Sequence, residues 1–172
     1  MTKKASVYVL LLVTLSVVLT HVSYRQKDNG LLFVVDEREI DIVGMFREKW
    51  GKLRRHCDRV TPLYPSSDQH QTIQRLIQDY SPPGSASAHI RSLQTMETWS
   101  LAAVEFENLL PAVVLIEHSD GVPTIVSHAI WSGYTHPWQP APYIRDYISG
   151  KAPHVATELF DCFEPGSRFF SP

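Results

Sequence analysis

The 172-residue sequence has few cysteines and no large excess of charge, and these absences narrow its class. Two cysteines allow at most one internal disulfide and exclude a disulfide-dense miniprotein. A formal net charge of −2 gives no general attraction for nucleic acid, so we expect no nucleic-acid partner. Apolar residues make up 44% and charged residues 20%, which is ordinary globular usage and excludes a disordered chain. The length suits one domain with an appendage.

The sequence also lacks the short motifs that usually identify an enzyme or a cofactor site. It has no G-x-S-x-G nucleophile elbow, Walker A loop, dinucleotide fingerprint or H-E-x-x-H helix. Its eight histidines stand at no known metal-ligand spacing, and the nearest pair, His154 with Glu158, supplies only two ligands. Glu105 and Glu107 would share a strand face, which is glycosidase-like but equally typical of an exposed strand. We expect no catalytic residue, no metal and no cofactor.

The longest apolar run extends from Ala5 to Tyr24 and contains no Lys, Arg, Asp or Glu. A helix of about 20 residues rises about 30 Å, which is the thickness of the hydrocarbon core of a bilayer. The residues between Thr20 and Ser23 offer no good cleavage site for a leader peptidase. The run therefore predicts a signal anchor, a transmembrane helix in residues 1–24. A cleaved secretory signal and a buried core helix are the alternatives.

The basic residues around this run orient the remainder of the chain. Lys3 and Lys4 favour a cytoplasmic N-terminus, although Arg25 and Lys27 nearly balance them on the far side. We expect a single-pass protein of a bacterial inner membrane, embedded through residues 5–24, with residues 25–172 as a periplasmic domain. Signal cleavage would instead leave this domain secreted or periplasmic. It has 14 basic and 18 acidic residues, a net charge of −4.

The two cysteines are consistent with export. Cys57 and Cys162 are an even number, far apart in the chain and without a C-x-x-C motif. In an oxidising compartment we expect them to form a disulfide. In the chain-entropy model, a bond closing a loop of this size stabilises the fold by about 4–5 kcal/mol. Two buried free thiols are the alternative.

The apolar periodicity predicts an α+β fold in which an antiparallel meander of three or four strands packs against flanking helices. Apolar spacings of three and four residues predict helices at 41–60, 68–80, 142–149 and 153–163. Apolar runs with β character predict strands at 99–107, 112–117 and 124–132, and 88–95 is a further strand or a helix. The run at 31–35 is an edge strand or a helical lead-in. We expect the helices to cover one face of the sheet.

Local signals mark where some of these elements begin and turn. Ser66 and Gln69 have the spacing of a capping box at the start of the helix at 68–80. The sequence 119–121, Ser-Asp-Gly, predicts a hairpin turn because glycine accepts a positive φ. Pro142 stands where proline is favoured in the first turn of a helix.

The helix expected at 41–60 is amphipathic. Its apolar residues recur at helical spacing: Val43, Phe46, Trp50, Leu53 and Cys57. Basic residues lie between them. We expect the apolar stripe to pack inside the domain. The basic face is then solvated, or it contacts phospholipid heads or an acidic partner.

The segment 131–145 (WSGYTHPWQPAPYIR) is the densest group of aromatic residues and prolines in the sequence. Prolines reduce the freedom of a loop, and stiff aromatic side chains dominate binding hot spots. We take as candidate binding residues Trp131, Tyr134, His136, Trp138, Tyr143 and Arg145. In the alternative, the aromatic side chains fold inward and cap one end of the sheet.

These features favour a membrane-anchored bacterial envelope protein whose periplasmic domain binds another macromolecule without catalysis. We expect a protein partner in the envelope, which makes the chain an accessory subunit of an envelope or secretion complex or an immunity-type inhibitor (immunity protein) of a toxin. The alternatives are a small periplasmic hydrolase acting on wall or lipid, and a small-ligand-binding domain with a cavity in a curved sheet. An enzyme should show titratable groups in contact within a cleft. A ligand carrier should show an apolar cavity. A partner-binding protein should show an exposed aromatic patch.

Overall fold

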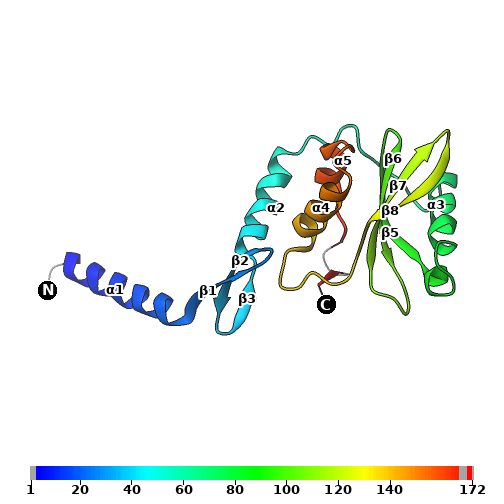
Figure 1. The fold of residues 1–172 in the computed structure, drawn as a ribbon. Coiled ribbons are helices and arrows are strands. Elements are labelled where there is room, and N and C mark those ends of the chain that lie inside the picture. The colour runs from blue at the N-terminus through cyan, green and yellow to red at the C-terminus, as the bar shows by residue number, and fades with distance from the viewer. Residues whose placement is uncertain (1–2, 167–169, 172) are drawn as a thin grey trace. The chain divides into compact units, whose positions relative to one another are not determined.

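The computed structural model describes residues 3–166 and 170–171, and it confirms an α+β fold with antiparallel sheets (Figure 1). The chain divides into two compact units, Met1–Phe46 and Arg47–Pro172. The boundary falls within helix α2 (Ile42–Arg54). Residue 24, at which we expected the anchor to end, lies inside strand β1 (Val22–Lys27).

The first unit begins with helix α1 (Lys3–His21). In the part of the chain that the structure describes, no helix is long and apolar enough to cross a membrane, so the expected transmembrane helix is not found. The apolar run is divided, because its last residues leave the helix and enter β1. Hydroxyl residues also lie within the apolar run: Thr14, Ser16 and Thr20 donate hydrogen bonds to backbone carbonyls one turn earlier in the continuous helix.

A small antiparallel sheet completes the first unit. Its strands lie in the order β1, β2 (Gly30–Val35) and β3 (Arg38–Ile40). The segment at 31–35 is therefore a strand, but it is the central strand and not an edge, and its Leu32 is fully buried. Asp36 and Glu37 both have positive φ values, of 47° and 68°, and form the two-residue turn between β2 and β3.

The second unit is built on a five-stranded antiparallel sheet. The strands lie side by side in chain order: β4 (Thr61–Pro62), β5 (His89–Met96), β6 (Trp99–Glu105), β7 (Ala112–Ser119) and β8 (Val122–Ser132). The segment at 88–95 is thus a strand. The predicted turn between β7 and β8 is confirmed, because Asp120 and Gly121 have φ values of 53° and 80°.

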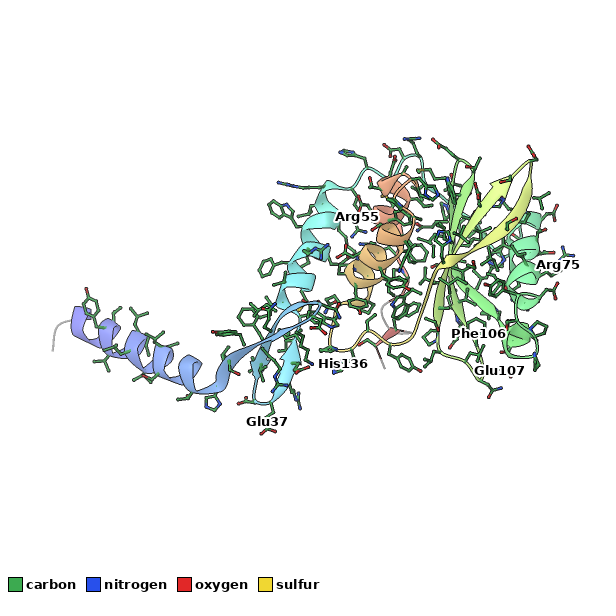
Figure 2. All side chains as sticks on the ribbon, in the orientation of Figure 1. Glu37, Arg55, Arg75, Phe106, Glu107 and His136 are labelled. Carbon is green, nitrogen blue, oxygen red and sulfur yellow. A yellow bond between two sulfur atoms is a disulfide. The ribbon has the colours of Figure 1, made fainter. Side chains whose placement is uncertain are left out.

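Helices cover both faces of this sheet, so the prediction of a single covered face is wrong (Figure 1). Helix α3 (Asp68–Gln78) lies on one face, with Arg75 on its outer side (Figure 2). Helices α4 (Pro140–Lys151) and α5 (Thr157–Cys162) lie on the other. The reason is the composition of the central strands β6 and β7: residues 101–104 and 112–116 are all buried, whichever way they point. Such continuous apolar runs are typical of strands covered on both faces.

Helix α3 begins at Asp68 as predicted, but its N-cap and the start of α4 differ from the prediction. The N-cap of α3 is Ser67 and not Ser66, because the Ser67 hydroxyl accepts a hydrogen bond from the backbone N–H of His70 at 3.2 Å. Helix α4 begins at Pro140, two residues before Pro142. A short 3-10 helix, η1 (Gly84–Ser87), connects α3 to β5.

Candidate functional site

Helix α2 exposes the apolar stripe that we expected to be packed, and that prediction is wrong. The side chains of Trp50 and Leu53 are 57% and 81% exposed, and Phe46, one turn earlier, is 70% exposed. Residues at these spacings lie on one side of a helix. We call Trp50 and Leu53, which belong to the second unit, the outer face of α2.

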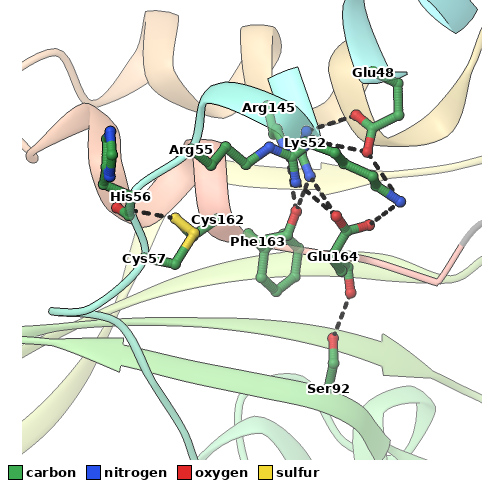
Figure 3. Close-up of polar contacts among 10 residues, drawn as sticks. All are labelled: Glu48, Lys52, Arg55, His56, Cys57, Ser92, Arg145, Cys162, Phe163 and Glu164. Atoms are coloured by element: carbon green, nitrogen blue, oxygen red, sulfur yellow. Dashed lines mark hydrogen bonds and ion pairs between the residues drawn. A yellow bond between two sulfur atoms is a disulfide. The ribbon is translucent and has the colours of Figure 1, made fainter. Parts of the chain in front are cut away.

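The opposite side of α2 is polar and is held by ion pairs (Figure 3). Glu48 accepts hydrogen bonds from Arg55 at 2.8 Å and from Arg145 of α4 at 2.7 Å. Arg55 also donates to Glu164 at 2.6 Å, and Nε of Arg145 donates to the carbonyl of Phe163 at 2.8 Å. We call Glu48, Arg55, Arg145 and Glu164 the ionic tether, because they join α2 to α4 and to the segment after α5.

The charges of the tether stabilise one another. Burial alone would raise the pKa of Glu48, but the hydrogen bond from Arg55 and the nearby cations outweigh it and hold this pKa below its ordinary value. For Arg145, burial has the larger effect and lowers the pKa, although the negative charge of Glu48 acts in the opposite direction. Arginine does not lose its proton in proteins, so the tether holds fixed charges and is not an acid–base pair. It joins α2 to α4 and to the segment after α5.

The predicted disulfide between Cys57 and Cys162 is confirmed. Their Cα atoms are 5.7 Å apart, and the bond joins the segment after α2 to the end of α5 (Figure 3). The second half of α2 is therefore fixed by the tether along the helix and by a covalent bond just beyond its end.

Cationic residues border the outer face. The guanidinium of Arg54 lies over the ring of Trp50, 4.5 Å from its centroid. On a helix of 3.6 residues per turn, Lys49 lies on the opposite border of the stripe. Arg47 instead binds Asp146 with two hydrogen bonds, of 2.8 and 2.9 Å. The outer face is therefore an aromatic and aliphatic surface with a basic edge.

The aromatic segment at 131–145 is divided between the interior and the surface. Trp131 is buried, and its ring packs edge-on against Phe170 with 5.3 Å between centroids. Arg145 is buried in the ionic tether. These two candidate binding residues therefore serve packing and attachment in the second unit.

The remaining candidate residues of this segment lie closer to the surface. Trp138 and Tyr143 stack on each other with 6.4 Å between ring centroids, and both are half-buried. Tyr134 and His136 are exposed in the loop before α4, and His136 is labelled in Figure 2. The structure therefore does not bring all six residues to one surface, and a binding role for the exposed ones stays a prediction.

The two glutamates considered for catalysis do not share a strand face. Strand β6 ends at Glu105, which binds Arg91, so Glu107 lies beyond the strand and does not share its face. Ser100 Oγ lies 2.8 Å from His118 Nε2, in the manner of a nucleophile and its base. Ser100, however, is 0% exposed, and burial lowers the pKa of His118. This pair is a partly buried hydrogen bond between strands β6 and β7.

The pair considered for metal binding is also occupied by other contacts. The ring of His154 packs edge-on against Trp99, with 5.3 Å between centroids. Glu158 forms an ion pair with Arg59 at 3.2 Å. Over residues 3–166 and 170–171, no cluster of three or more His, Cys, Asp or Glu side chains is arranged to hold a metal ion.

An apolar pocket of about 330 Å³ lies where the end of α3 meets strands β7 and β8. Its lining includes Ile77 of α3, Phe106 after β6 and Ile130 of β8. Phe106 lies at the end of the sheet near α3 (Figure 2). We did not predict this pocket. The available signal was the pair Leu109 and Leu110, two large apolar residues in a turn that needs none.

Comparison with known proteins gives no function for either the outer face of α2 or the apolar pocket. No protein-family model, no curated protein and no solved structure matches this chain. The outer face of α2 and the apolar pocket are therefore interpreted from their own geometry and chemistry.

Proposed function

We propose that this chain is a non-catalytic binding protein of an oxidising compartment, and that the outer face of α2 docks into an apolar groove of a partner protein. The observation that carries the proposal is the exposure of Trp50 and Leu53 on a helix that is fixed from its other side. An amphipathic helix normally buries such a stripe. This one buries its ion pairs and presents the stripe to solvent.

The spacing of the outer face suits recognition of a helix by a groove. Trp50 and Leu53 stand at positions i and i+3, a spacing that is usual for anchors of a helix lying in a hydrophobic groove. Tryptophan is the residue type most enriched in binding hot spots. Exposed apolar side chains that form a contiguous patch generally mark an interaction surface.

The attachment of α2 lowers the cost of binding. A free helix would lose conformational freedom when it entered a groove, and that loss opposes association. The ionic tether and the disulfide have already fixed the second half of α2 in the unbound protein. The binding surface is therefore presented in a preorganised form.

The charges favour a protein partner over an anionic membrane. Two of the basic residues of α2 are already neutralised within the chain: Arg47 by Asp146, and Lys52 by Glu48 and Glu164. Residues 25–172 also carry a net charge of −4, which repels anionic lipid. We therefore expect an apolar groove with an acidic edge that meets the basic border of the outer face.

The disulfide supports export to an oxidising compartment such as a bacterial periplasm. Disulfides persist there and are rare in the cytosol. In such a compartment the domain would act as an accessory subunit of an envelope or secretion complex, or as an immunity-type inhibitor. Both roles need a stable surface for a protein partner.

Site-specific crosslinking tests this proposal. A photoreactive amino acid replaces Leu53 in the full chain, and a matched variant carries it at Val122, which is also apolar and exposed but is the first residue of β8. We expect a discrete protein adduct in intact cells from position 53 and none from position 122. The adduct is then identified, and its affinity for the purified chain is measured.

The affinity of the identified partner makes the test quantitative. We expect Trp50→Ala to weaken binding by about 30-fold, as for a hot-spot residue, without lowering the midpoint of unfolding. The control Tyr64→Ala, also at an exposed aromatic residue, should bind as the wild type does. Equal adducts from positions 53 and 122 would contradict the proposal. So would loss of binding to phosphatidylglycerol vesicles in Trp50→Ala without any protein adduct, which would assign the outer face to a membrane.

A further inference from the structure

The apolar pocket beside α3 is a second site, separate from the outer face of α2. It measures about 330 Å³, which is within the usual range for small-ligand sites. Its walls are aliphatic and aromatic, with Ile77 from α3, Val114 from β7 and Ile125 and Ile130 from β8. The pocket is therefore formed between one helix and one face of the sheet.

The few polar residues of the pocket are uncharged. The hydroxyl of the most buried one, Ser85, already has hydrogen-bond partners within the protein. The lining includes Tyr80, Ser81, Ser85 and Ser132, and no carboxylate, amine, guanidinium or imidazole among the described residues. The buried hydroxyl of Ser85 donates to the carbonyl of Gln78 at 2.7 Å and accepts from the backbone N–H of Ser81 at 2.9 Å. The interior of the pocket thus offers neither a counter-ion nor an unsatisfied hydrogen-bonding group.

Apolar side chains also lie at the mouth of the pocket. Leu109 and Leu110 line it and are each 49% exposed. Leu109 packs against the backbone of η1, where a Cβ added at Gly84 would come within 3.2 Å of its Cδ1. A bound chain would cover the exposed parts of both leucines, which raises the apolar area that binding removes from water.

We propose that this pocket binds a single aliphatic chain of about ten carbons, carried by a neutral molecule such as a medium-chain alcohol, ester or amide. The length follows from the volume, if each methylene takes roughly the 30 Å³ that one water occupies in the liquid. The neutral class follows from the lining, because a buried charge requires a partner and none is present among the described residues. The head of the ligand lies at the mouth, near the hydroxyls of Tyr80 and Ser132.

A chain-length series tests the proposal on the full chain with its disulfide intact. Binding of n-alkanols from six to twelve carbons is measured by calorimetry. We expect saturable binding of one molecule per chain, with an affinity that rises about fourfold per methylene and levels off near decanol. Decanoate and decylammonium should bind no more tightly than decanol. Absence of saturable binding, or a rise that continues unchanged to dodecanol, would overturn the proposal.

Matched variants locate the binding to this pocket. Ser132→Phe places a large side chain in the pocket from an exposed position at the end of β8, and Ser127→Phe makes the same change on β8 outside the lining. We expect the first to weaken decanol binding at least tenfold and the second to leave it unchanged. Equal effects of the two would refute the assignment.

A third variant and a crosslink cover the remaining outcomes. Ile130→Ala enlarges the pocket, so the chain length at which affinity levels off should increase; a levelling point that does not move counts against the proposal. A photoreactive residue at position 110 should form an adduct of lipid mass in intact cells. A protein adduct would instead assign the pocket to a partner's side chains and overturn the proposal.

Discussion

Glu48→Gln tests whether the ionic tether, and not the apolar stripe, holds α2. The substitution keeps the size of the side chain and removes its charge, so Arg55 and Arg145 lose their shared carboxylate. Removing one member of a fully buried ion pair costs about 3–5 kcal/mol. Here Arg55 keeps Glu164, Arg145 keeps the carbonyl of Phe163, and the cluster is partly exposed. We therefore expect a loss of about 2 kcal/mol at neutral pH.

The pH dependence gives this prediction a second readout. The pKa of Glu48 is lower in the folded chain than its ordinary value. Its charge therefore stabilises the fold above the unfolded-state pKa of about 4.3, and this contribution is lost as the pH falls through the lowered folded-state value. The difference in unfolding free energy between wild type and Glu48→Gln should consequently shrink towards pH 3.

Urea denaturation of the oxidised chain between pH 3 and pH 7 measures both quantities. Glu107→Gln is the control, because it makes the same chemical change at an exposed carboxylate beyond the end of β6. A difference below about 0.5 kcal/mol at pH 7, the usual size of an unremarkable surface change, would refute the role of the tether. A larger difference that does not change with pH would refute its electrostatic origin.

Two further predictions concern the disulfide and the cap of α3. Reducing the disulfide, which joins residues 105 apart, should lower the free energy of unfolding by up to about 4–5 kcal/mol; an unfolding midpoint that is the same with and without reductant would contradict this. Ser67→Ala should cost about 1 kcal/mol because it removes the N-cap of α3, whereas Ser66→Ala should cost almost nothing. Equal losses in these two variants, measured by thermal unfolding, would show that the cap is misassigned.

Strands β6, β7 and β8 and helix α3 could be predicted because their signals are local, whereas β1, β3 and β4 were not predicted. Alternation, apolar runs and turn residues place β6, β7, β8 and α3 within a few residues of their observed bounds. The number of covered sheet faces was also present in the sequence, since the runs at 101–104 and 112–116 do not alternate. Continuous apolar runs of this kind indicate two covered faces, contrary to the expectation that the helices cover one.

The orientation of α2 could not be obtained from periodicity. The spacing of Trp50 and Leu53 shows that they share one side of a helix, but not whether that side contacts the domain. What decides the orientation is a set of ion pairs between residues distant in sequence, such as Glu48 with Arg145, 97 residues apart. No local pattern relates such residues. The same holds for the pocket, whose walls come from segments between Ile77 and Ser132.

The two-sided covering of the sheet has a consequence for how the chain would respond to two ligands. The pocket lies on the α3 face of the sheet, and the tether that carries α2 is attached to α4 and to the segment after α5, on the other face. Strands β6 and β7 therefore separate the two sides of the sheet: Ala102 packs on the α3 side, and Ala103 packs on the side of α4 and α5. Sites without shared contacts behave additively. The effects of Ser132→Phe and Trp50→Ala on stability should then add. Binding at one surface should leave the affinity of the other surface unchanged.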